Sequence, residues 1–288
     1  MSSDDPNCTP LAPGLYVVAT PIGNLEDITL RALRILKQSD LIACEDTRQT
    51  QKLLNHFGIT TRTTSYHEHN ETSRAEELVG DLAKGARIAL VTDAGMPGIS
   101  DPGYRVIAKA VEQQIPVIPV PGASAFVAAL AASGLGTDSF GFHGFLPPKR
   151  GQRRQALENI KTSQQTQVFY EAPHRVKEAI EDVLELLGTE RQVVVAREIT
   201  KVHEEFLRGH ASDVLKEISS RADIKGEITL LIGRAEGKET APSAASISQL
   251  VQQAMSEEGL DEKAALKKAA KSKGISKSEA YRELQRRK

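Results

Sequence analysis

The sequence predicts an α/β fold with two α/β domains, the first built on a largely parallel sheet, followed by a small C-terminal helical module. Short apolar runs alternate with stretches of helical periodicity through most of the chain, a pattern typical of parallel sheets covered by helices. After residue 246 the apolar runs stop and only helical spacing remains. A length of 288 residues also fits about two domains.

The most unusual segment of the first domain is residues 87–103. Residues 88–91 form a short apolar run, as expected for a strand buried on both faces. Asp93 follows, and five glycine and proline residues then fall between positions 95 and 103. Glycine permits positive φ and close approach of a ligand, and proline stiffens a loop. Because ligands bind at the carboxyl ends of strands in open α/β sheets, we expect a binding loop here.

The same arrangement recurs along the first domain, which we place at residues 14–138. The expected strands are residues 15–19, 41–44, 61–66, 88–91 and 116–120. The expected helices are residues 30–38, 50–57, 74–83, 104–113 and 125–132. Each strand is followed by a polar or Gly/Pro-rich loop, so a parallel sheet would gather these loops at one edge.

The second α/β domain is expected at residues 139–235. Its expected strands are residues 139–145, 166–170, 193–197, 205–208 (an edge strand) and 228–232. Its expected helices are residues 152–160, 176–187 and 211–219. A proline-containing loop, residues 146–151, separates the first strand of this domain from its first helix.

The two ends of the chain differ in composition from the α/β domains. Residues 1–13 are polar and proline-rich, and we expect a disordered start. Residues 236–246 are expected to form a linker. Residues 247–288 suit three short helices in a basic, helix-turn-helix-like module, with Asp261 near the start of the second and Ser276 capping the third.

Composition excludes several classes of protein. Two cysteines are too few for a disulfide framework and favour a reducing compartment. The first residues lack the basic and apolar regions of a signal peptide, and no apolar run is long enough to span a bilayer. We therefore expect a cytoplasmic protein with no membrane association.

The charge distribution is uneven although the net charge is only −1. Residues 261–288 hold ten Lys and Arg against four Asp and Glu. A second basic cluster consists of Lys149, Arg150, Arg153 and Arg154. Basic regions on an acidic body favour a polyanionic partner, although a solvated helix face and a protruding loop would have the same composition.

Common ligand motifs are absent from the sequence. No Gly-x-Gly-x-x-Gly follows the first strand, and there is no phosphate-binding Gly-Lys-Ser/Thr loop. His67 and His69 would point in opposite directions on a strand, so no metal site is expected. The segment from Gly122 to Ala125 resembles a nucleophile elbow, with Phe126 in place of the second glycine, so a serine hydrolase using Ser124 remains an alternative.

Several motifs together resemble the tetrapyrrole methylase superfamily, and most closely its ribosomal RNA branch, over roughly residues 14–235. The matching segments are Thr20-Pro21-Ile22-Gly23-Asn24-Leu25, Glu45-Asp46-Thr47-Arg48, Asp93-Ala94-Gly95-x-Pro97, Ser100-Asp101-Pro102-Gly103, Pro121-Gly122-Ala123-Ser124, Gly144-Phe145-Leu146-Pro147 and Phe169-Tyr170-Glu171. The tail resembles that branch's small C-terminal helical domain. Met96 and Ala123 depart from the branch, which usually has Thr and Pro there.

The resemblance implies a two-domain tetrapyrrole-methylase-like fold with the methyl donor S-adenosylmethionine between the domains, and no metal. It implies homodimers that methylate the 2′-hydroxyl of a cytidine in the decoding region of 16S rRNA, within the small ribosomal subunit. The donor site is expected at Pro21, Asp93, Gly95, Met96, Ser124, Ala125, Tyr170, Arg197 and Glu227. The basic cluster Lys149, Arg150, Arg153 and Arg154 is expected to bind the RNA.

A ribose hydroxyl is a weak nucleophile, so we expect a general base or a hydrogen-bond acceptor beside it. Glu171 is the first candidate; Glu198, His67 and His69 are others. A salt bridge from Glu171 to Arg175 or Arg197 is an equally good interpretation of that carboxylate. Two further alternatives remain open. A small-molecule methyltransferase of the corrin or sirohaem type would not need the basic regions, and a non-enzymatic RNA-binding module would need no donor site.

Overall fold

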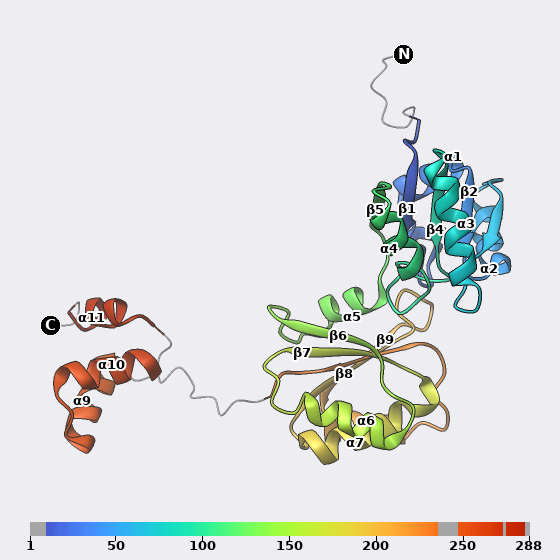
Figure 1. The fold of residues 1–288 in the computed structure, drawn as a ribbon. Helices are drawn as coiled ribbons and strands as arrows, with labels where there is room; N and C mark the ends of the chain where they lie inside the picture. Colours follow the sequence, from blue (N-terminus) through green and yellow to red (C-terminus); the bar gives the residue numbers. More distant parts are fainter. Residues whose placement is uncertain (1–9, 236–246, 273–274, 286–288) are drawn as a thin grey trace. The chain divides into compact units, whose positions relative to one another are not determined.

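The computed structural model describes residues 10–235, 247–272 and 275–285 (Figure 1). The chain divides into two compact units, Met1–Ala235 and Glu236–Lys288. The expected linker at residues 236–246, residue Gly274 and most of the expected disordered start lie outside the described residues. Leu11, by contrast, is described, and it is buried in the core.

The first sheet of the larger unit has five strands, in the order β3-β2-β4-β1-β5. Its strands are β1 (Gly14–Val18), β2 (Leu41–Cys44), β3 (Thr63–Ser65), β4 (Arg87–Val91) and β5 (Val117–Val120). Every pairing in this sheet is parallel, which confirms the α/β prediction. The parallel arrangement brings all five carboxyl ends, and the loops that follow them, to one edge.

Helices cover both faces of the first sheet. They are α1 (Leu30–Gln38), α2 (Thr47–His56), α3 (Glu71–Ala83) and α4 (Tyr104–Glu112), with a short 3-10 helix η1 (Leu25–Asp27) before α1. One core cluster takes in residues of α1 and α2, and a second takes in residues of α3 and α4. Helix α2 begins three residues earlier than expected, because the Asp46 side chain accepts a hydrogen bond from the Arg48 N–H.

The second sheet is mixed, with the order β6-β7-β10-β8-β9. Its strands are β6 (Phe140–Phe145), β7 (Thr166–Glu171), β8 (Gln192–Arg197), β9 (Glu205–His210) and β10 (Ile228–Ile232). Strands β6 and β7 are parallel and the other pairs are antiparallel. Strand β9 lies at an edge, as expected.

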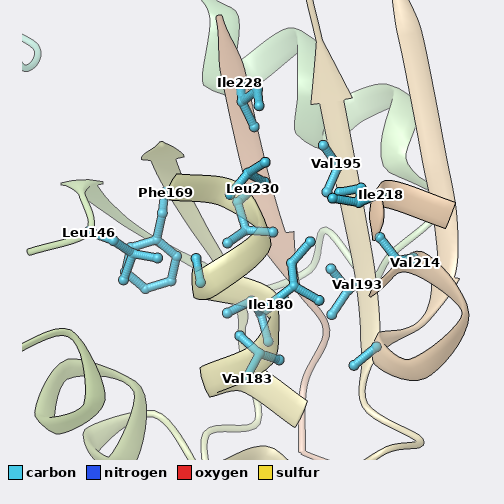
Figure 2. Packing of buried hydrophobic residues seen from close by; sticks show 14 of the residues in the cluster. Leu146, Phe169, Ile180, Val183, Val193, Val195, Val214, Ile218, Ile228 and Leu230 are labelled. Atoms are coloured by element: carbon cyan, nitrogen blue, oxygen red, sulfur yellow. The ribbon is translucent and has the colours of Figure 1, made fainter. Parts of the chain in front are cut away.

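The two faces of the second sheet are covered differently (Figure 1). Helices α6 (Arg150–Asn159), α7 (Val176–Leu187) and α8 (Ala211–Ser219), with η2 (Pro173–Arg175), enclose the main core on one face, part of which is shown in Figure 2. Helix α5 (Ala125–Ser133) packs on the opposite face, where Leu130 joins a cluster with Val168 and Leu231. Because the carboxyl edge of the first sheet leads directly into α5, its loops face this second surface. The exact domain boundary near residue 138 stays a prediction.

The smaller unit contains three helices, as expected: α9 (Ile247–Glu258), α10 (Glu262–Ser272) and α11 (Lys277–Gln285). Their apolar faces form one small core that includes Val251, Leu266 and Leu284. The Asp261 carboxylate accepts a hydrogen bond from the Ala264 N–H, and Ser276 and Glu279 cap the start of α11 reciprocally. Within the described residues of both units, no helix is long and apolar enough to cross a membrane.

Candidate functional site

The loops after β1 and β4 are joined directly at the carboxyl edge of the first sheet. The Thr20 N–H donates to the Gly95 carbonyl at 2.9 Å, and the Gly95 N–H donates to the Thr20 carbonyl at 3.1 Å. Gly95 has φ +84°, a conformation that a residue with a side chain rarely adopts. This pair of hydrogen bonds holds the two loops as one rigid wall.

A cavity of about 370 Å³ lies between this wall and the second sheet. Its size is within the range typical of small-molecule sites. It is lined by loops of the first sheet, the start of α5, the end of β7 and the turn before β10. The lining residues are Ile22, Ala94, Gly95, Met96, Ile99, Ser100, Asp101, Ser124, Ala125, Phe145, Tyr170, Glu171, Ala172, Pro173, Ile199, Gly226, Glu227, Ile228 and Thr229. We call it the first cavity.

A second cavity of about 460 Å³ adjoins the first. It is lined by the loops after β1 and β4, the exposed side of α2, and two residues of the second sheet's loops. The lining residues are Thr20, Pro21, Ile22, Gly23, Leu25, Gln49, Thr50, Lys52, Leu53, Thr92, Asp93, Ala94, Lys201 and Glu227. Three residues, Ile22, Ala94 and Glu227, line both cavities, so the two spaces meet at these side chains.

The boundary between the cavities is braced by Lys201. Its ammonium group lies 2.8 Å from a carboxylate oxygen of Glu198 and 3.2 Å from one of Glu227. Its aliphatic stem lies directly against Gly23, where a Cβ atom would collide with it. Glu198 and Thr200 both have positive φ, at 53° and 67°. Such strained residues persist only where the surrounding contacts hold them.

The structure brings most of the expected donor-site residues together. Six of them line the first cavity: Gly95, Met96, Ser124, Ala125, Tyr170 and Glu227. Pro21 and Asp93 line the second cavity instead, where the Asp93 carboxylate accepts a hydrogen bond from the Asp46 N–H at 3.1 Å. Arg197 lines neither cavity, so the structure does not bring it together with the other expected donor-site residues. Its guanidinium is bound to the Glu205 carboxylate and the Lys225 carbonyl.

Glu171 is fully buried at the end of β7 and lines the first cavity. Its Oε1 atom accepts hydrogen bonds from the Arg175 guanidinium at 2.7–2.9 Å and from the Ala172 N–H at 2.7 Å. The salt bridge to Arg175 is therefore the interpretation that the structure confirms. Its Oε2 atom is buried and has no hydrogen-bond partner among the described residues. A buried acceptor without a partner is costly, and a ligand that donates a hydrogen bond would relieve that cost.

Asp101 is a site residue that the sequence analysis did not single out, although it lies in the glycine- and proline-rich loop after β4. It lines the first cavity. Burial, together with the nearby carboxylates Glu45 and Asp93, raises the pKa of Asp101 to about 7. The signal was available in the sequence, since an acidic residue stands between Ser100 and Pro102 in a loop already expected to bind a ligand.

Replacing Asp101 with asparagine should stabilise the ligand-free protein in a pH-dependent way. The folded-state pKa lies above the ordinary value of 3.8, so ionisation favours the unfolded state. The loss of folding free energy that ionised Asp101 causes in the parent protein is absent below pH 4, grows between pH 4 and pH 7, and is fully present above pH 7. Melting temperatures of Asp101→Asn and the parent, measured from pH 5 to pH 8, should diverge by several degrees and then level off. A constant difference would show that Asp101 has an ordinary pKa.

The basic cluster at the start of α6 is not the free surface that the sequence suggested. Arg153 is 1% exposed, and its guanidinium donates to Asp182 at 2.8 Å. Arg150 and Arg154 also bind Asp182, at 3.2 and 3.0 Å. The cluster therefore packs against α7, on the face of the second sheet opposite α5. The expectation that Arg153 binds RNA is wrong, because its side chain is buried and paired. Lys149 is exposed and precedes α6.

Two alternative site chemistries find no support in the part of the chain that the structure describes. His67 and His69 follow β3 in a turn rather than lying on it, their ring centroids 5.9 Å apart, and no group of metal-binding side chains is found. Ser124 has an extended, unstrained backbone, and no histidine lines the cavity that it faces. A serine nucleophile needs such a base, so a serine hydrolase is not favoured.

Comparison with known proteins decides the family. Residues 14–215 match the family model of tetrapyrrole (corrin/porphyrin) methylases. The chain belongs to this family. Curated relatives include the ribosomal RNA small subunit methyltransferase I of Halalkalibacterium halodurans, 50% identical over 93% of this chain and 93% of the relative. A protein of the same name from Escherichia coli O157:H7 is 44% identical, again over 93% of both chains.

Solved structures agree on the fold of this tetrapyrrole methylase family member. The uroporphyrin-III-C-methyltransferase of Thermus thermophilus matches 77% of this chain and 95% of its own, with a TM-score of 0.55 and 18% identity. The methyltransferase CobJ matches with a TM-score of 0.58 and 19% identity, over 77% and 94% of the two chains. At such low identity these matches establish the fold alone.

Proposed function

We propose that the protein transfers a methyl group from S-adenosylmethionine to the ribose 2′-oxygen of a cytidine in 16S rRNA. The observation that carries the proposal is the pair of adjoining cavities. One is enclosed by both sheets and suits a small ligand, and the other opens beside α2 and suits part of a larger one. The relatives named ribosomal RNA small subunit methyltransferase I support RNA as the acceptor.

The residues of the first cavity fit the methyl donor, which combines an apolar purine with a charged amino acid. Ile22, Met96 and Ile228 provide apolar walls. The Asp101 carboxylate and the free Oε2 atom of Glu171 provide acceptors for ammonium or hydroxyl hydrogens. The start of α5, where no side chain caps the backbone N–H groups, suits a carboxylate. When bound, S-adenosylmethionine supplies an electrophilic methyl group.

The acceptor ribose is assigned to the second cavity, which meets the first at Ile22, Ala94 and Glu227. Glu227 is the ionisable side chain that lines both cavities, so it is the group best placed to accept the hydrogen of an attacking hydroxyl. Lys201 holds this carboxylate from one side. Glu171 lines only the first cavity, which favours a role in holding the donor over a role as the base. Positioning of the two reactants then supplies most of the rate acceleration.

Nucleoside mapping tests the proposed function. Small ribosomal subunits that lack the modification are incubated with the full-length protein and S-adenosylmethionine, and their RNA is digested and analysed by mass spectrometry. We expect a 2′-O-methylated cytidine. A base-methylated nucleoside would overturn the assignment of the acceptor atom. Methylation of a uroporphyrinogen instead of RNA would favour the small-molecule alternative.

A further inference from the structure

The helices on one face of the first sheet carry an unusual charge pattern. Residues 28–39, which contain α1, and residues 47–62, which contain α2, include no Asp or Glu. The same two segments contain six Lys and Arg residues. Such a local excess of cations stands out in a chain with a net charge of −1. Both helices pack into one core cluster, so their outer surfaces belong to the same side of the domain.

Five of these cations form no salt bridge with a carboxylate of the described residues; one of them, Arg62, donates to the Asp40 carbonyl at 3.0 Å and is set aside, which leaves four. Arg31, Lys37 and Lys52 are exposed, and Arg34 is half-buried. Arg48 is paired with Asp46 and is not included. The nearby Asp40 is occupied by Arg87, which lowers its pKa to about 2. We call Arg31, Arg34, Lys37 and Lys52 the α1–α2 basic face.

The opposite side of the same sheet provides a comparison. Helices α3 and α4 carry Asp and Glu side chains as well as three cations. Each of these cations is paired with a carboxylate of α3: Arg74 with Glu77, Arg105 with Glu71 and Lys109 with Glu76. Every cation of α3 and α4 is therefore paired, and five Asp and Glu residues stand against three Lys and Arg there, whereas α1 and α2 carry cations and no Asp or Glu.

The α1–α2 basic face is also next to the site. Lys52 lines the second cavity together with its neighbours Gln49 and Leu53, and its ammonium group donates a hydrogen bond to Gln49 at 2.8 Å. Leu25, which lies five residues before α1, lines the same cavity. Of the four cations, Lys52 is the one that lines this cavity, so the α1–α2 basic face reaches the site through α2.

We propose that the α1–α2 basic face is the docking surface for the phosphate backbone of the RNA on either side of the target nucleotide. The inference rests on the proposed function, since it assumes an RNA acceptor in the second cavity. Cations without a carboxylate partner can bind phosphate without first breaking a salt bridge. The arginines at the start of α6 would have to break their salt bridges with Asp182 to do so. Such contacts position the RNA and do not read its sequence.

Binding of a transcript of the 16S rRNA decoding region at several salt concentrations tests this surface. The test variant is Arg31→Ala/Arg34→Ala/Lys37→Ala, and Lys52→Ala is measured separately. The matched control is Arg74→Ala/Arg105→Ala/Lys109→Ala, which removes the same charge from the opposite side of the sheet. We expect the test variant to bind about tenfold more weakly at moderate salt. Its plot of log affinity against log salt should be flatter by about 0.7–0.9 for each phosphate that the protein no longer neutralises. The control should keep the parent's slope.

The outcomes separate the two proposals. If the parent neither binds nor methylates the RNA, the proposed function fails. If the parent methylates the RNA and the test variant keeps the parent's salt slope, the docking surface is wrong while the function stands. Loss of binding to anionic phospholipid vesicles, with RNA binding unchanged, would also overturn the inference by assigning the face to a membrane. Unchanged calorimetric affinity for S-adenosylmethionine verifies that each variant is folded.

Discussion

Replacing Asp182 with alanine is expected to destabilise the larger unit by about 3–5 kcal/mol, the range typical of a buried ion pair that loses one partner. Asp182 is 1% exposed and receives hydrogen bonds from Arg150, Arg153 and Arg154. Burial raises the pKa of Asp182, but these hydrogen bonds together outweigh burial and lower it. Without Asp182, the Arg153 guanidinium would remain in the core with only Glu178 beside it, at 3.3 Å.

Thermal or urea unfolding measures the effect, with a loss in melting temperature on the order of 10 °C. Glu185→Ala is the matched control, because Glu185 binds two of these arginines, Arg150 and Arg154, at the surface, where its side chain is 51% exposed. Exposed ion pairs contribute little to stability, so the control should unfold almost like the parent. Equal destabilisation by the two substitutions would contradict the central role assigned to the buried carboxylate.

Replacing Glu171 with glutamine is expected to weaken binding of S-adenosylmethionine by roughly 10- to 150-fold, the equivalent of losing one hydrogen bond to a charged group. The substitution keeps the shape of the side chain and removes its charge. It changes the buried Oε2 acceptor of a residue that lines the first cavity, and it also weakens the bond from Arg175 to Oε1. Isothermal titration calorimetry with the purified full-length protein measures the affinity directly.

Glu227→Gln is the matched control for Glu171→Gln. Because Glu227 lies where the two cavities meet and is held by Lys201, this variant should keep most of its donor affinity and lose turnover with RNA. The reverse result, normal donor affinity in Glu171→Gln with loss of turnover, would return Glu171 to the role of general base. A melting curve for each variant excludes unfolding as the cause.

The order of strands and helices could be predicted because each element has its own local signal. Helix α7 and strand β10 have the predicted bounds. The spacing of apolar residues marks both elements in the sequence, and a glycine or a turn marks where each one ends. The carboxyl-edge loops were also predictable, because glycine and proline mark them in the sequence. Six expected donor-site residues accordingly line one cavity.

Contacts between distant segments could not be predicted in the same way. Arg153 and Asp182 are 29 positions apart on two helices, and a basic cluster looks the same in a sequence whether or not a carboxylate faces it. Arg197 was expected in the donor site from the family resemblance, but its guanidinium is bound by the Glu205 carboxylate on the adjacent strand. The positive charge of α1 and α2 was hard to recognise for a different reason, since the five cations spread over these two helices form no continuous run in the sequence.

The contact between Gly23 and Lys201 has a mechanical consequence for the whole site. Gly23 belongs to a loop of the first sheet, and Lys201 belongs to a loop of the second. The aliphatic stem of Lys201 fills the space that a side chain at position 23 would need. The loop after β1 and the loop after β8 can therefore approach each other this closely only because residue 23 is a glycine. Any larger residue at position 23 must displace Lys201 from Glu198 and Glu227, and the gap between the two sheets would then lose its fixed width.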